Sequence, residues 1–144
     1  MNWYVLAACA ALCMALYNLL IKAAAGHLHA MVGAVVLQVV AALMGAGLLL
    51  LLYVRGALPP SLATPKGITL AALAGVSIGL AEILTFAVYS KGAPASVGTP
   101  LIVGGSVLLT AVVGVLLLRE TLSWPQALGT LLVVGGVALL ARGH

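Results

Sequence analysis

The stretch ITLAALAGVSIGLAEILTFAVY, residues 68–89, decides the fold of this chain. At 1.5 Å per residue, an apolar helix of this length can cross about 30 Å of hydrocarbon. Near its middle stands Glu82, one of only two acids in the sequence. An acid at the centre of a membrane helix costs about 2.5–3.5 kcal/mol on insertion scales, so it usually faces a protein interior or a water-filled path. We therefore expect a membrane protein in which Glu82 takes part in binding a cation, a proton or both.

Four further apolar segments of similar length accompany this one, at residues 3–21, 30–54, 95–118 and 124–141. The composition is 65% hydrophobic and 6% charged, which excludes an ordinary soluble globular domain. The runs are continuous and do not alternate as the strands of a membrane barrel do. The sequence therefore predicts an all-α membrane protein with five transmembrane helices in a single domain, residues 1–144.

The first segment has a second interpretation, as a cleaved signal peptide. Ala23, Ala24 and Ala25 resemble a small-residue cleavage site. However, residues 1–4 lack the basic residues of a signal peptide, and Lys22 comes after the apolar stretch. We expect the segment to remain in the protein as a signal-anchor helix.

The connections carry helix-end signals. Thr64-Pro65 offers an N-cap followed by proline at the first helical position, and Ser123-x-x-Gln126 has the form of a capping box. The second helix is expected to stop at residues 55–60, which include Gly56 and two prolines. Most connections are short, so helices adjacent in sequence are expected to pack antiparallel.

The basic residues are divided evenly between the two membrane faces. With five crossings, the face of the N-terminus holds Arg55, Lys66 and Arg119. The opposite face holds Lys22, Lys91 and Arg142. An excess on one face normally fixes orientation. Either another factor sets the orientation, or copies insert both ways and pair as an antiparallel homodimer. Such a dimer would recreate the inverted repeat of many secondary transporters, because one chain shows no internal repeat.

The residue pattern around Glu82 predicts a packed helix face. Helical spacing puts Gly75, Gly79, Glu82, Phe86 and Tyr89 on one stripe. Gly75 and Gly79 form a GxxxG motif, which lets a neighbouring helix approach closely. The carboxylate is therefore expected to face either a substrate cavity or an interhelical contact.

Other helices offer polar partners. Gln38 and Glu82 each lie eight or nine residues from the Lys22 and Lys91 face, at roughly 13 Å of helix, so their depths match. Asn18 and Ser106 belong to stripes on the first and fourth segments, and Ser106 is the hydroxyl of the fourth segment nearest the membrane centre. We expect the substrate and proton site to comprise Glu82, Gln38, Asn18, Ser106 and Tyr89; ordinary interhelical hydrogen bonding is the alternative for the hydroxyl and amide groups. The fifth segment has glycines but no deep polar side chain, which suits packing or dimerisation.

Essentially the whole chain resembles a known family, and the resemblance is most specific after Lys91. The resemblance is carried by residues 87–95, Pro100, Arg119-Glu120-Thr121-Leu122, Gln126, Gly129 and Gly135-Gly136-Val137, with Asn18 and Lys22 ending the first helix. These features are similar to the EamA-type domain of the drug/metabolite transporter superfamily. Most members have two such domains, inverted relative to each other, so the resemblance implies that this single unit dimerises. It also implies export or exchange of small metabolites, with helices one to four lining the path.

The two acids differ in their relation to that family. Glu120 matches its acid after the fourth helix, where we expect it to order the loop, and it is left out of the site. Glu82 does not match a family-wide position. Small multidrug resistance proteins are related antiparallel dimers with an essential membrane Glu, but theirs lies on the first of four helices.

These observations favour a secondary transporter that moves a small, perhaps cationic metabolite or drug by proton- or cation-coupled exchange. Lipid-carrier translocation and a non-transporting membrane subunit are the alternatives. No nucleophile–base pair or metal cluster points to an enzyme or a cofactor, and no basic cluster points to nucleic acid. We expect a multi-pass protein of a bacterial inner (plasma) membrane, surrounded by lipid.

Overall fold

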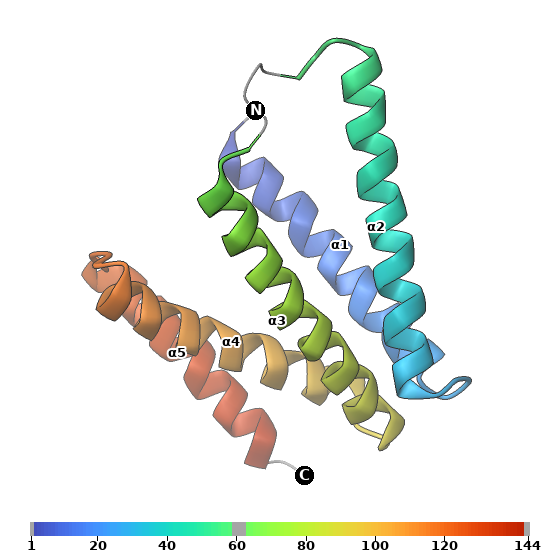
Figure 1. Cartoon of the computed structure of the whole chain (residues 1–144). Coiled ribbons are helices and arrows are strands. Elements are labelled where there is room, and N and C mark those ends of the chain that lie inside the picture. The colour runs from blue at the N-terminus through green and yellow to red at the C-terminus, as the bar shows by residue number, and fades with distance from the viewer. Residues whose placement is uncertain (1, 59–62, 143–144) are drawn as a thin grey trace. The chain divides into compact units, whose positions relative to one another are not determined.

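The structure, a computed structural model, describes residues 2–58 and 63–142 (Figure 1). It contains five helices, each long and apolar enough to span a membrane, and no strand within those residues. Their bounds are α1 Trp3–Ala24, α2 Ala30–Val54, α3 Pro65–Ser90, α4 Ala95–Leu117 and α5 Trp124–Arg142. The prediction of an all-α protein with five transmembrane helices is confirmed.

The helix ends follow the capping signals in the sequence. The Thr64 hydroxyl accepts a hydrogen bond from Gly67 N–H at 3.1 Å, so α3 begins at Pro65, three residues before the apolar run. Gln126 Oε1 accepts from the Ser123 backbone N–H at 2.8 Å and from its hydroxyl at 2.9 Å, which holds the start of α5. The N-cap predicted at Thr64 is confirmed, and at Ser123 the Gln126 side chain makes its half of the predicted capping box.

The second helix ends in a Schellman turn. Gly56 has φ +62°, and the N–H of Ala57 donates to the carbonyl of Leu52 at 3.0 Å. Glycine adopts this left-handed conformation without steric cost, so the chain leaves α2 directly after Arg55. The prolines predicted to follow, Pro59 and Pro60, lie outside the described residues.

The chain divides into two compact units. Unit 1 comprises Met1–Leu19 and Gly92–His144, and unit 2 comprises Leu20–Lys91. Unit 1 therefore holds most of α1 together with α4 and α5. Unit 2 holds the last turn of α1 with α2 and α3, including Glu82.

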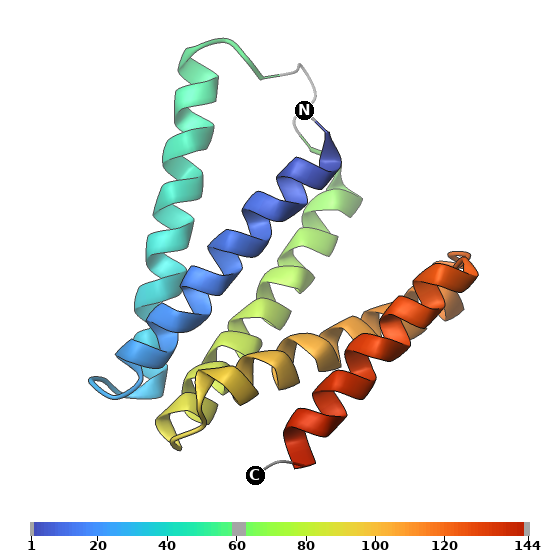
Figure 2. The same ribbon diagram turned by 180° about the vertical axis from the view of Figure 1, so that it is seen from behind.

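Within unit 2, α2 and α3 pack at one end only. They lie side by side where α2 begins and α3 ends, and they diverge toward the connection between them (Figures 1 and 2). The exposure of the side chains follows this divergence, because residues 39–57 and 63–78 are all exposed. We call the packed part, around Gly33 and Phe86, the tight end of unit 2.

Within unit 1, α4 and α5 pack against each other through a stripe of small and β-branched residues. The half-buried residues of α5 recur every three or four positions, namely Ala127, Thr130, Val134 and Val137. A γ-methyl group of Val137 lies against Gly104 of α4, where even a Cβ would collide with it. The close approach of α4 and α5 therefore depends on a glycine at this point.

The turn after α4 is held by Glu120. Arg119 adopts the left-handed conformation with φ 56°, and the Glu120 N–H donates to the Gly114 carbonyl at 3.1 Å. A Cβ on Gly114 would lie 2.8 Å from Glu120 Oε2, so the carboxylate folds back over a glycine. This arrangement agrees with the expectation that Glu120 orders the loop. Earlier in the helix, α4 continues through Pro100.

Candidate functional site

Glu82 is buried in the tight end of unit 2, with 5% of its surface exposed. The other buried residues of α3 are Thr85, Phe86 and Tyr89, all within the two turns that follow it. Spacings of three, four and seven residues put Glu82 on the same helix face as these side chains. Glu82 has a partner within the structure. The packed stripe predicted around this acid is thus present from Gly79 to Tyr89.

Gln38 reaches the same face of α3 from α2. Its side-chain amide donates to the Gly79 carbonyl at 3.4 Å, and Gly79 lies three residues before Glu82. An ideal Cβ on Gly79 would be 3.4 Å from Gln38 Oε1, so the glycine leaves room for the amide. The prediction that Gln38 and Glu82 share a depth is confirmed to within one turn of α3.

The two helices are held together by direct contact between Gly33 and Phe86. A Cβ on Gly33 would lie 2.5 Å from Phe86 Cε1 and 2.6 Å from Leu28 Cδ1. Phe86 is 3% exposed, and Ala34, the residue after the glycine, is fully buried. This packing positions Glu82 one turn from the aromatic ring and excludes most solvent from around it.

The tight end closes with a contact between the last turn of α1 and the last turn of α3. The Lys22 ammonium lies over the Tyr89 ring, 5.8 Å from its centre. Tyr89 is only 2% exposed, whereas Lys22 is half-buried. The Ser90 hydroxyl also donates to the Ala25 carbonyl at 3.5 Å. A cation within about 6 Å of an aromatic face is attracted to it, so the contact is favourable.

Asn18 and Ser106 belong to unit 1. Asn18 is buried, and its amide donates to the Met14 carbonyl of its own helix at 2.8 Å. Ser106 is exposed in its unit and donates to the Val103 carbonyl of its own helix at 2.7 Å. These hydrogen bonds are intrahelical, where the alternative interpretation expected interhelical ones. Of the five predicted site residues, Gln38, Glu82 and Tyr89 belong to unit 2, where Gln38 bonds one turn before Glu82 and Tyr89 lies two turns after it on α3.

Small residues that flank Gln38 form a stripe on α2, and both this stripe and the predicted GxxxG stripe of α3 are packed over only part of their length. On α2 the stripe is packed at Ala34 and Gln38, but Ala41 is exposed and a Cβ on Gly45 would meet nothing within 4 Å among the described residues. The GxxxG motif of α3 behaves in the same way, since Gly79 contacts Gln38 whereas Gly75 meets nothing within 4 Å. The divergence of α2 and α3 accounts for both differences.

Two residues of this region were not predicted as part of the site. Lys22 enters the sequence analysis as a charge that bears on topology, and its contact with the Tyr89 ring is not predicted there. Thr85, 7% exposed, donates its hydroxyl to the Ala81 carbonyl at 2.8 Å. Its spacing of three residues from Glu82 would have placed it on the same face.

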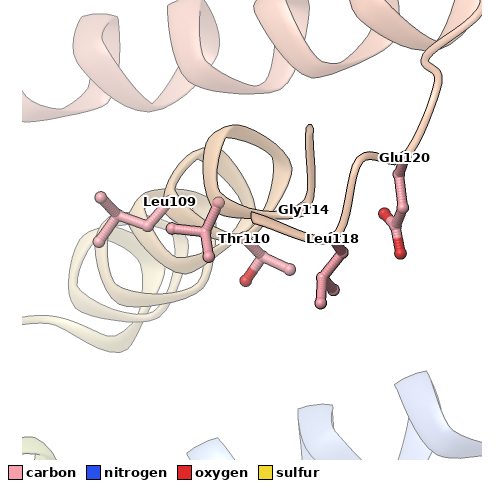
Figure 3. Close-up of a pocket in the computed structure, with 6 residues that line it drawn as sticks. Leu109, Thr110, Gly114, Leu118 and Glu120 are labelled. Atoms are coloured by element: carbon pink, nitrogen blue, oxygen red, sulfur yellow. The ribbon is translucent and has the colours of Figure 1, made fainter. Parts of the chain in front are cut away.

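Unit 1 has a pocket of about 300 Å³ at the C-terminal end of α4 (Figure 3). Its polar groups are the Thr110 hydroxyl and the Glu120 carboxylate, and Glu120 is exposed. The lining residues are Leu109, Thr110, Val113, Gly114, Leu118 and Glu120. The two acids of the chain therefore occupy different units and differ in burial, Glu82 being enclosed and Glu120 open.

The tight end of unit 2 offers polar groups and an aromatic face. Glu82 supplies a carboxylate, Gln38 an amide, Thr85 a hydroxyl, and Tyr89 an aromatic face that carries a cation. Among the described residues, no group of three or more His, Cys, Asp and Glu side chains could hold a metal ion. The arrangement suits reversible binding of a proton or an organic cation.

Comparison with protein families gives a match over nearly the whole chain. The model of the EamA-like transporter family matches residues 1–142. Searches of curated proteins and of solved structures found no match.

Proposed function

Because the chain belongs to the EamA-like transporter family, and is thus a membrane transporter of the drug/metabolite superfamily, we propose that it exchanges a small organic cation for protons. Members of this family are transporters and not enzymes. The proposal adds the substrate charge, the coupling ion and the residue that couples them.

The burial of Glu82 carries this proposal. A carboxylate that is 5% exposed in a membrane helix is costly to retain, and ionisable groups at this depth typically serve ion or substrate pathways. Two packed groups lie close to Glu82 along α3: Gln38 of α2 bonds to the Gly79 carbonyl one turn before it, and Phe86 follows one turn after it. The site is therefore polar, enclosed and held by packing.

Coupling follows from competition for one carboxylate. Glu82 holds either a proton or the cationic substrate, so substrate binding releases the proton and protonation releases the substrate. If the site opens to one membrane face at a time, each substrate ion that leaves is replaced by protons entering from the other side. In this mechanism Gln38 and Tyr89 orient the substrate.

The working form is proposed to be an antiparallel homodimer in a bacterial inner membrane. The even division of basic residues between the two faces supports insertion in both orientations. The uncovered glycines of α5, Gly129 and Gly136, also offer a surface for close helix packing, since a Cβ at either would meet nothing within 4 Å among the described residues. Two inverted copies would supply the symmetry that alternating access uses.

The test is transport by the purified chain in proteoliposomes that contain a pH-sensitive dye. A panel of organic cations and neutral metabolites is added outside, and substrate-dependent proton movement is recorded. The proposal expects proton movement with one or more cations and none with matched neutral compounds. If no compound of the panel drives proton movement, and another membrane protein always co-purifies with the chain, a non-transporting subunit is favoured instead.

A further inference from the structure

We infer that the ring of Tyr89 is a binding site for organic ammonium ions, and that the Lys22 ammonium is an internal occupant which the substrate displaces. This inference rests on the proposed function, because it names the chemical class of the substrate and a residue that sets its affinity. It starts from a cation already in place. The Lys22 ammonium lies 5.8 Å from the centre of the Tyr89 ring.

The ring is fixed while its occupant can move. Tyr89 is 2% exposed, and it follows Phe86 on a face of α3 that is packed against α2. The hydrogen bond from Ser90 to the Ala25 carbonyl holds the end of α1 beside the end of α3. Lys22 is only half-buried, and its ammonium sits on a flexible four-carbon stem. The side chain can therefore leave the ring without unpacking the helices.

The ring and the carboxylate form one surface that favours cations. Glu82 and Tyr89 are seven residues apart on α3, which is two turns or about 10 Å along the same helix face. A substrate that carries an ammonium group is attracted to both positions. Lys22 is the group that already supplies an ammonium to this surface, so the lysine and the substrate exclude each other from the ring.

Competition of this kind lowers the apparent affinity for the substrate. A ligand that binds only when its site is vacant loses affinity in proportion to the fraction of vacant sites. Removing the Lys22 charge should therefore strengthen binding of an organic cation. If Lys22 instead bound an anionic group of the substrate, removing its charge would weaken binding of that substrate.

The test measures binding of radiolabelled choline, a small quaternary ammonium ion, to the full-length chain in detergent. Lys22→Gln should lower the Kd for choline by about threefold to thirtyfold, the range that follows from the strength of cation–π contacts. Lys22→Arg keeps the internal cation and should bind choline as the wild type does. Tyr89→Phe should keep binding, whereas Tyr89→Leu should lose it.

Lys91→Gln is the matched control, because Lys91 is exposed at the same end of α3. It should leave the Kd for choline unchanged. The uncharged isostere 3,3-dimethylbutanol should compete with choline equally poorly in the wild type and in Lys22→Gln. The inference is overturned if the Kd of Lys22→Gln for choline equals that of Lys91→Gln or is higher. It is also overturned if Tyr89→Leu binds choline fully, or if neither the wild type nor Lys22→Gln binds choline.

These outcomes separate the inference from the proposed function. If the wild type drives proton-coupled flux but Lys22→Gln matches Lys91→Gln, the inference fails and the proposed function stands. If the wild type moves no substrate in proteoliposomes while the choline affinities change as expected, the proposed function fails and the ammonium site remains.

Discussion

At the scale of single residues, Gly33 decides how closely α2 and α3 approach each other at the tight end. The Phe86 ring occupies the space that any side chain at position 33 would need. Phe86 in turn stands one turn from Glu82 on the same face, so this glycine contributes to the enclosure of the acid. Gly45, three turns later on α2, has open space around it among the described residues.

The variant Gly33→Ala should therefore destabilise the protein, and Gly45→Ala should not. The new Cβ at position 33 would lie 2.5 Å from Phe86 Cε1, and overpacking of this kind typically costs about 1–3 kcal/mol. At position 45 the alanine should be neutral or stabilising by up to about 1 kcal/mol, because alanine favours helix over glycine. Thermal unfolding of both variants in the same detergent checks this. Equal unfolding temperatures would contradict the packing described at the tight end.

Some of the site could be predicted from single residues and some could not. The depth match of Gln38 and Glu82 follows from counting residues from the helix ends, and the hydrogen bond from Gln38 to Gly79 bears it out. The contact of Lys22 with Tyr89 depends on how the end of α1 approaches α3, which no spacing within one helix specifies. A hydrophobicity pattern also treats a lysine at a helix end as an interface anchor.

At the scale of helices, length and position were predictable because each apolar run has the length of a membrane crossing. The ends were predictable where a capping residue stands, as at Thr64 and Gly56. Packing was less predictable. The glycines of the GxxxG motif in α3 have different surroundings, since Gly79 contacts Gln38 and Gly75 contacts nothing within 4 Å among the described residues. Small residues permit close approach, but the crossing of the helices determines where it happens.

The packing of α4 and α5 gives a prediction at this scale. Gly104→Ala should destabilise the contact between the two helices, because its Cβ would collide with the Val137 side chain. Overpacking suggests a cost of about 1–3 kcal/mol. The double variant Gly104→Ala with Val137→Ala should recover part of the loss, since it removes the colliding methyl groups. Unfolding in detergent measures each variant.

Gly105→Ala serves as the control, because a Cβ on the adjacent glycine would meet nothing within 4 Å among the described residues. It should match the wild type or exceed it slightly. A Gly104→Ala variant as stable as Gly105→Ala would mean that α4 and α5 do not meet at Gly104.

At the scale of the whole molecule, the chain belongs to the EamA-like transporter family and has a balanced distribution of charge. Three basic residues lie on each side of the predicted membrane, and the family match extends over residues 1–142. The charge count shows that the two membrane faces of the chain carry equal numbers of basic residues. It does not show which helix surfaces would meet in a dimer, because that depends on how the shapes of two copies fit together. The dimer therefore remains a prediction drawn from charge balance and the uncovered glycines of α5.

Loop labelling tests the orientation of the chain in the membrane. Cys9 and Cys13 are first replaced by serine, and single cysteines are placed at His27 and at Ala57, in loops predicted on opposite faces. Dual topology predicts that a membrane-impermeant maleimide labels part of each population from outside intact cells, and the remainder after lysis. Labelling of one position only, from one side only, would establish a fixed orientation and remove the basis for an antiparallel pair.

The central claim is that the buried acid Glu82 couples substrate movement to protons, and the chain offers a matched test because its only other acid is the exposed Glu120. The decisive measurement compares proton-coupled substrate flux in proteoliposomes of the wild type, Glu82→Gln and Glu120→Gln, with equal reconstitution checked by size-exclusion chromatography. Our account predicts that Glu82→Gln reduces coupled flux to the level of empty liposomes while the protein stays folded, and that Glu120→Gln keeps it. Flux at the wild-type rate in Glu82→Gln would contradict the account.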